Sequence, residues 1–114
     1  MKTRAFAVLM TLALSAVTYA GEKGEWKENH PRRAEVNARL NNQNRRIKEG
    51  VEDGKLSKQQ AQQLHSEDHA IRQQERADAA ANGGHITKAE QKQLNQEENA
   101  TSKQIYNEKH PNSP

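Results

Sequence analysis

A helix-start signal that occurs twice constrains the fold of this chain more than any other feature. Ser57 is followed three residues later by Gln60, and Thr87 is followed three residues later by Glu90. In such a capping box the hydroxyl accepts a hydrogen bond from the backbone N–H three residues on, and the later side chain accepts one from the N–H of the cap. The pattern predicts that one helix begins just after Ser57 and another just after Thr87.

The two helix starts belong to a longer internal repeat. Residues 56–60 and Leu64 align with residues 86–90 and Leu94, and residues 67–70 align with residues 97–100, all at an offset of thirty. Leu56 and Ile86 stand immediately before the caps, and glycines lie shortly before them. A repeated unit of turn, apolar residue, cap and helix, with turns this short, favours antiparallel neighbouring helices.

The segment before the repeat has its own helical stripe. Val36, Leu40, Ile47 and Val51 are separated by 4, 7 and 4 residues, which places them on one face of a helix. Pro31 suits the first turn of that helix.

Together these signals predict three helices over residues 31–50, 57–82 and 87–109. Gly50 and Gly54 should end the first helix, and Gly83 with Gly84 the second. We predict an all-α fold of three antiparallel helices, arranged as a small helical bundle or as extended helical hairpins.

The material for a core is thin after residue 20, and there is no cysteine to form a disulfide. The large apolar side chains there are Trp26, Val36, Leu40, Ile47, Val51, Leu56, Leu64, Ile71, Ile86, Leu94, Ile105 and Tyr106. Full burial of each contributes about 1.5–3 kcal/mol, whereas ordering each residue costs about 1.5 kcal/mol. We therefore expect marginal stability for a lone chain, and added stability from a protein partner or from self-association.

The first twenty residues have the composition of an export signal. Lys2 and Arg4 precede an apolar run over residues 5–17, and Thr18 and Ala20 place small residues at a signal peptidase site. The run is too short to span a membrane as a helix. We expect export to the periplasm or beyond, and a mature chain that starts at Gly21 and carries no transmembrane segment.

The same reasoning divides the rest of the chain. Residues 21–30 show no helical or strand period, which predicts a flexible arm. Residues 31–110 are expected to form a helical domain. Residues 111–114 contain two prolines and are expected to form a disordered tail.

Without residues 1–20, 16 of the 18 Lys and Arg residues remain against 15 Asp and Glu residues, which argues against a nucleic-acid partner. Positive charge is concentrated in the first predicted helix, at Arg32, Arg33, Arg39, Arg45 and Arg46. This basic face could grip an acidic polymer or lipid head groups. We favour the alternative, in which it pairs with the acidic later helices.

Two histidines are candidate metal ligands. His65 and His69 are four residues apart on the second predicted helix, so both imidazoles lie on one face and could share a divalent zinc, nickel or copper ion. A third ligand would have to come from His30, His85 or His110. The simpler interpretation is a pair of exposed histidines on a polar helix, with no cofactor.

The two turns also resemble the second half of an EF-hand calcium loop. With Gly54 at the glycine position, Gln60 stands where the bidentate glutamate belongs; with Gly84 there, Ala79 and Ala81 replace the early carboxylates. A degenerate EF-hand-like cation site is an alternative, and helix capping explains the same residues.

No constellation for catalysis is visible. There is no cysteine nucleophile, no serine in a nucleophile elbow and no phosphate loop at residues 83–84. We expect the carboxylates to lie on solvated helix faces, where no apolar pocket would displace their pKa values. The sequence therefore predicts a non-enzymatic protein.

Much of the chain after residue 20 resembles a family of small exported bacterial proteins of unknown function. The matching positions are Arg46, Ile47, Gly50, Gly54, Leu56, Ser57, Gly84, Ile86, Thr87, Glu90, Ser102, Ile105, Tyr106, Lys109 and His110. The resemblance implies export and repeated helical hairpins, and it implies no activity. We expect an envelope or secreted interaction module, with a periplasmic metal-binding protein that uses His65 and His69 as the alternative.

Overall fold

The computed structural model describes residues 24–112 of the 114-residue chain. The predicted export signal, its cleavage site before Gly21 and residues 113–114 lie outside the described residues. Within residues 24–112 there are helices and short turns but no strand. The main helices are α2 (Pro31–Glu52), α3 (Lys58–Ala81) and α4 (Lys88–Lys109). The predicted all-α fold is therefore confirmed.

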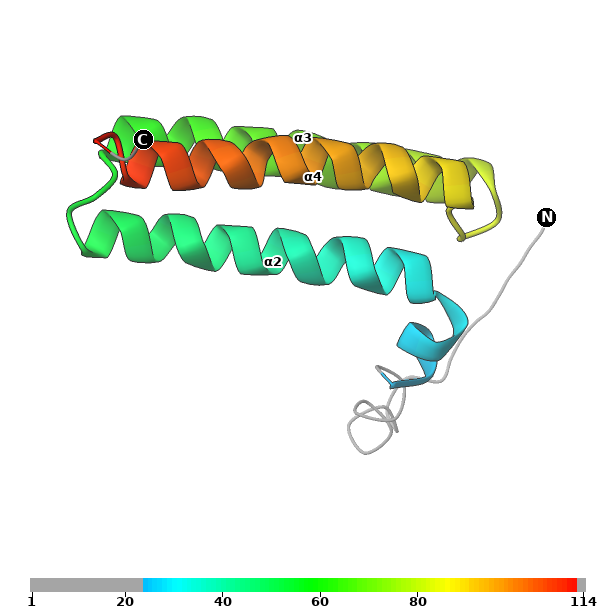
Figure 1. Cartoon of the computed structure of the whole chain (residues 1–114). Helices are drawn as coiled ribbons and strands as arrows, with labels where there is room; N and C mark the ends of the chain where they lie inside the picture. The colour runs from blue at the N-terminus through cyan, green and yellow to red at the C-terminus, as the bar shows by residue number, and fades with distance from the viewer. Residues whose placement is uncertain (1–23, 113–114) are drawn as a thin grey trace. The chain divides into compact units, whose positions relative to one another are not determined.

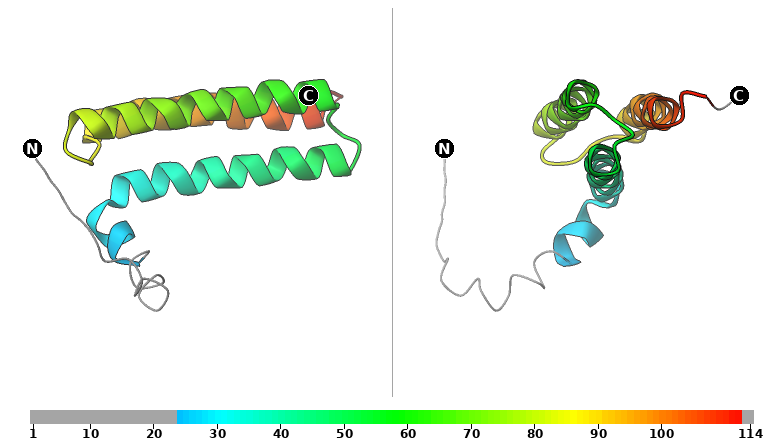
Figure 2. Two further views of the ribbon diagram at one scale, coloured as in Figure 1. Left: turned by 180° about the vertical axis from the view of Figure 1, so that it is seen from behind. Right: turned by 90° about the vertical axis from the view of Figure 1, so that its left-hand side faces the viewer.

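The described residues divide into two units between Pro31 and Arg32. In the unit from Arg32 onward, α2, α3 and α4 lie side by side and alternate in direction (Figure 1). The views in Figure 2 agree with this arrangement. Side chains of all three helices share buried clusters, so the unit is a bundle and not a set of extended hairpins.

Both capping boxes are present at the starts of α3 and α4. The Ser57 hydroxyl accepts from the Gln60 N–H at 3.0 Å, and the Gln60 side chain accepts from the Ser57 N–H at 2.9 Å. Thr87 and Glu90 repeat the pair at 3.0 and 2.8 Å. The capped groups are N–H donors that have no partner inside a helix, which is why the helices begin where they do.

The first helix continues past its predicted end. Gly50 lies inside α2, which ends at Glu52, and the turn is made by Gly54 with a φ of 74°. The carbonyl of Gly50 accepts from the N–H groups of Lys55 at 2.8 Å and of Leu56 at 3.0 Å. These bonds wrap the chain around the end of the helix, so Gly54 and not Gly50 is the terminating residue.

The core of the bundle consists of two apolar clusters. One contains Val36, Leu40, Ile71, Ala79, Ile86 and Leu94, and the other contains Ile47, Leu56, Ala61, Leu64 and Ile105, with Val51 packed against it. Leu64 and Leu94 match in the sequence repeat but lie in opposite clusters, because α3 and α4 run in opposite directions. Among the three helices, only α3 and α4 bring Cα atoms within 8 Å of each other. Side chains therefore span the wider separation to α2.

The segment before the bundle differs from its prediction. Residues 24–29, placed in a flexible arm by the sequence, form a short helix, and residues 111–112 form a turn where a disordered tail was expected.

No helix in the described part of the chain combines the length and the apolar character that crossing a membrane requires.

Candidate functional site

A polar layer interrupts the core between the two apolar clusters. Each helix passes from one cluster to the other through at least one buried polar side chain: Gln43 in α2, Asp68 in α3 and Glu98 in α4. Their exposed fractions are 2%, 2% and 0%. We call these three residues the central polar layer. Polar side chains so deeply buried need hydrogen-bond partners to offset the loss of water.

The layer is only partly hydrogen-bonded. Gln43 Nε2 donates to the main-chain oxygen of Glu98 at 2.8 Å, which ties α2 to α4. Both side-chain oxygens of Asp68 and of Glu98, and Oε1 of Gln43, are buried without a hydrogen-bond partner. These five buried oxygen atoms therefore lack hydrogen-bond donors, and an added proton would supply one.

Burial raises the pKa of Asp68 from its ordinary value of 3.8 to about 6. Desolvation is the largest cause, because the charged carboxylate loses water. Arg72 and Arg46 lower the pKa, and Glu67 raises it further. The cationic neighbours offset only part of the burial.

Burial also raises the pKa of Glu98, from 4.5 to about 7. Arg39 opposes the desolvation most, and the negative charge of Asp68 adds to it. A negative charge on Asp68 makes ionisation of Glu98 less favourable, so the two protons are lost in steps that belong to the pair. The pair therefore keeps part of its proton at pH values where ordinary carboxyl groups are fully ionised.

Glu75 shows how a buried carboxylate in this bundle is otherwise satisfied. It is 1% exposed and forms an ion pair with Arg33, whose Nε and Nη2 atoms both reach its carboxylate. Arg33 Nη1 also donates to the Gly84 carbonyl at 3.1 Å. Asp68 and Glu98 have no such forked partner, which distinguishes the central polar layer from an ordinary buried ion pair.

The sequence-based placement of the carboxylates on solvated faces is wrong at these three positions. Asp68, Glu75 and Glu98 are buried, and two of them have displaced pKa values. The signal in the sequence is the gap of seven between apolar positions such as Leu64 and Ile71. A helix face buries a residue every three or four positions, so the side chain within that gap must also face inward.

The basic face of α2 is used inside the bundle. Arg39 Nη1 lies 3.5 Å from Glu98 Oε1, and Arg46 Nη1 donates to Ser102 Oγ at 2.8 Å. Arg32 donates to the Ile86 carbonyl at 3.3 Å. With Arg33, four of the five predicted arginines contact α3, α4 or the turn between them, whereas Arg45 pairs with Glu49 in its own helix. The contacts agree with pairing between the first helix and the later ones.

The two candidate metal ligands, His65 and His69, are exposed on α3. His65 Nδ1 lies 3.0 Å from Asn44 Oδ1, and His69 Nε2 lies 3.3 Å from Gln73 Nε2. Among residues 24–112, no group of three or more potential metal-ligating side chains comes together. Metal binding by the pair stays a prediction of the sequence.

The EF-hand-like turns hold their key side chains in other roles. Gln60 and Glu90, at the position of the calcium-binding glutamate, accept hydrogen bonds from the caps. Glu90 also accepts from Asn82 Nδ2 at 3.0 Å. These side chains would have to leave their caps to bind a cation.

Two exposed aromatic side chains form matching stacks that the sequence reasoning missed. Trp26 stacks on His30 with a centroid separation of 4.7 Å, and Tyr106 stacks on His110 at 4.2 Å. In each pair the histidine Nδ1 lies against the main-chain oxygen of the aromatic residue, at 2.9 and 2.8 Å. The signal is a shared order of aromatic residue, histidine four positions later, and then proline.

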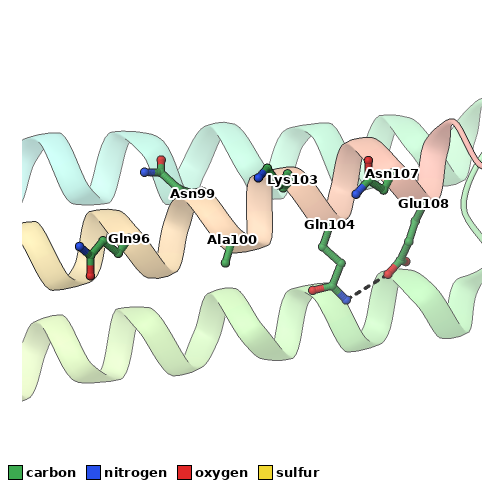
Figure 3. A pocket seen from close by; sticks show the side chains of 7 residues that line it. All are labelled: Gln96, Asn99, Ala100, Lys103, Gln104, Asn107 and Glu108. Atoms are coloured by element: carbon green, nitrogen blue, oxygen red, sulfur yellow. Dashed lines mark hydrogen bonds between the residues drawn. The ribbon is translucent and has the colours of Figure 1, made fainter. Parts of the chain in front are cut away.

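One hollow on the surface lies along a single helix. A hollow of about 700 Å³ runs along α4 and is lined only by residues of that helix (Figure 3). Its side chains are polar apart from Ala100, and Gln104 donates to Glu108 at 3.0 Å within it. Since no second element closes the hollow, it cannot exclude water from a bound molecule, as a catalytic pocket must.

Comparisons with known proteins found no relative of this chain. No protein-family model, no curated protein and no solved structure matches the chain. The resemblance to small exported bacterial proteins therefore stays a prediction.

Proposed function

We propose that this protein is a small exported, non-catalytic helical module that works by binding a protein partner or a second copy of itself. One observation carries the proposal. Trp26 and Tyr106 are the large apolar side chains that the described residues leave exposed, at 36% and 51%, and each is stacked on a histidine. Exposed aromatic residues are enriched where proteins bind one another.

The stacks suit this role because they hold an aromatic ring in a fixed position. A side chain that is already ordered loses little conformational entropy when a partner covers it. Tyr106 also has a hydroxyl that can remain at the edge of an interface. The same histidines help to close the helix ends, so one contact serves both capping and presentation of the ring.

The burial of the two acids with displaced pKa values supports the proposal that the protein is not a catalyst. Asp68 and Glu98 have displaced pKa values but are 2% and 0% exposed between packed helices. General acids and bases act within hydrogen-bond reach of a substrate. Neither carboxyl meets that condition in the closed bundle.

The decisive experiment compares the mature chain with Tyr106→Ala and Trp26→Ala. Sedimentation over a range of protein concentrations measures self-association, and crosslinking in the native envelope followed by mass spectrometry measures partner binding. Asn107→Ala is the matched control, because it is an exposed neighbour of Tyr106 on α4. We expect both aromatic variants to lose association and the control to keep it. A wild-type chain that is monomeric and gives the same crosslinks as the aromatic variants would overturn the proposal.

Export is tested separately by the intact mass of the protein recovered outside the cytoplasm. We expect a chain that starts at Gly21, because small residues precede that position after the apolar run. A recovered chain that still contains residues 1–20 would show that no cleavage takes place there.

A further inference from the structure

We infer that the central polar layer is a proton-controlled latch: it holds the three helices closed while it retains a proton and loosens their packing when that proton is lost. The latch acts only on how the bundle is held together, so it does not depend on the proposed partner binding. It stands on the placement of Gln43, Asp68 and Glu98 between the two apolar clusters.

The central polar layer contains unpaired hydrogen-bond acceptors that a proton could serve. Asp68 and Glu98 contribute four carboxyl oxygens without hydrogen-bond partners, and Gln43 contributes one more acceptor. A protonated carboxyl is a hydrogen-bond donor as well as an acceptor, whereas a carboxylate only accepts. One proton therefore converts an array of acceptors into a layer in which a donor is available. Its loss leaves buried charge that water must enter to solvate.

The other charged groups that act on the pair come from α2 and α3. From α2, Arg39 and Arg46 are favourable to a carboxylate, and Glu35 is unfavourable. From α3, Arg72 is favourable and Glu67 unfavourable.

The two acids also act on each other, since ionised Asp68 on α3 acts unfavourably on Glu98 of α4. Burial outweighs the arginines, and both pKa values rise. The arginines limit the free-energy cost of ionising the layer. The bundle can therefore loosen as pH rises without unfolding completely.

Solvent lies close to the latch. A groove of about 370 Å³ on the surface between α2 and α4 is lined by Arg39, Arg46 and Ser102, and it reaches Gln43. Protons and water can therefore approach the layer from one side, between two arginines. The apolar clusters on either side of the layer block approach along the bundle axis.

The direction of the pH effect follows from the two pKa values. A carboxyl whose pKa is higher in the folded chain than in the unfolded chain holds its proton more tightly when folded. Its favourable contribution is complete below the unfolded value, near 4 for Asp68 and 4.5 for Glu98, and is lost as pH rises to about 6 and about 7. The bundle should thus be most tightly closed in mildly acidic solution.

The first test measures the latch directly in the wild-type mature chain. Carbon-13 NMR of the side-chain carboxyl groups follows each titration between pH 3 and pH 9. We expect one carboxyl of the Asp68 and Glu98 pair to titrate above about pH 6, well above an ordinary glutamate. Ordinary titration of both carboxyls would overturn the inference. This measurement does not depend on any variant folding.

The second test measures the consequence by urea unfolding at pH 5 and pH 8. Glu98→Gln keeps the shape of the side chain but cannot ionise, and Glu97→Gln removes the same charge from the neighbouring position, which lines a surface groove. We expect the unfolding constant of the control to rise from pH 5 to pH 8 by at least about tenfold more than that of Glu98→Gln. The difference between the two variants cancels the other titrating groups. Equal pH dependence in both would overturn the inference.

Amide hydrogen exchange locates the loosening. We expect faster exchange at pH 8, after correction for the intrinsic rate, in the turns of α3 and α4 that carry Asp68 and Glu98. The turns around Leu64 and Leu94 should change less, because they belong to the apolar clusters. Uniform acceleration along the helices would contradict a latch in the central layer.

Discussion

Gly50 of α2 lies directly against Leu56, the residue that precedes the cap of α3. A Cβ atom at position 50 would fall 2.6 Å from Cδ1 and 2.8 Å from Cγ of Leu56. Leu56 is 4% exposed and belongs to an apolar cluster, so its side chain has little room to move away. The turn between the two helices is therefore as tight as it is because residue 50 has no side chain.

The first prediction is that Gly50→Ala destabilises the bundle. Alanine would favour the helix by about 1 kcal/mol at an unhindered site. Here overpacking against Leu56 should outweigh that gain and give a net loss of about 1–3 kcal/mol. Thermal unfolding of the variant measures the effect, with Gly24→Ala as the control, because nothing lies within 4 Å of a Cβ there. A more stable Gly50→Ala protein would mean that Leu56 readily moves.

The second prediction concerns the two N-caps. Ser57→Ala and Thr87→Ala should each lower the free energy of unfolding by about 0.5–2 kcal/mol, because each leaves a backbone N–H of the first helical turn without its acceptor. Ser57→Thr and Thr87→Ser retain a hydroxyl and serve as controls. Melting temperatures that do not change in either alanine variant would show that water replaces the caps without loss.

The third prediction compares a buried ion pair with an exposed one. Arg33→Met leaves the carboxylate of Glu75, 1% exposed, without its forked partner and should cost on the order of 3 kcal/mol. Arg45→Met breaks a pair whose side chains are 60% and 49% exposed, and it should cost less than about 1 kcal/mol.

Urea unfolding of both variants at one pH makes this comparison. Adding Glu75→Gln to the Arg33→Met chain should recover part of the loss, because it removes the charge that was left unpaired. Equal losses for Arg33→Met and Arg45→Met would show that the buried pair adds nothing beyond its surface counterpart.

The fourth prediction is that an apolar residue in the central polar layer stabilises the bundle. Glu98→Met has a similar volume and joins the apolar clusters without a charge to desolvate. At pH 8 it should raise the free energy of unfolding by about 1–4 kcal/mol, the range found when buried charges are replaced by packed apolar groups. At pH 5, where Glu98 is protonated, the gain should be smaller. Calorimetry at the two pH values measures it, and a loss at pH 8 would contradict the prediction.

The sequence predicts the helices well because their signals are local. The caps at Ser57 and Thr87, the glycine turns and the apolar stripes each depend on residues a few positions apart, and the structure has all of them. The end of α2 is predicted two residues early because a glycine in a sequence can end a helix or permit a close contact. Only the position of Leu56 in space distinguishes these roles.

The central polar layer is not predicted, for a different reason. When two apolar residues of a helix are seven positions apart, one residue between them must also face the core. Two adjacent positions can fill that role, and both are occupied by polar residues, so the sequence leaves the choice open. Asp68 stands beside Glu67, and Glu98 beside Glu97, so either acid of each pair could face the core. Packing against α2 decides which one does, and that packing is made by residues far away along the chain.

The duplication that builds the α3 and α4 hairpin has a consequence for its charge. When a unit folds back against its own copy, each position generally meets a different position, and only near the midpoint does a residue meet its own counterpart. Asp68 and Glu98 are such counterparts, and each lies near the middle of its helix. A copied acid there must face an acid, so neutralisation has to come from outside the duplicated pair. In this chain α2, which is not a copy, brings Arg39 and Arg46 to that place, and Arg72 of α3, whose counterpart in α4 is Ser102, supplies the remaining cation.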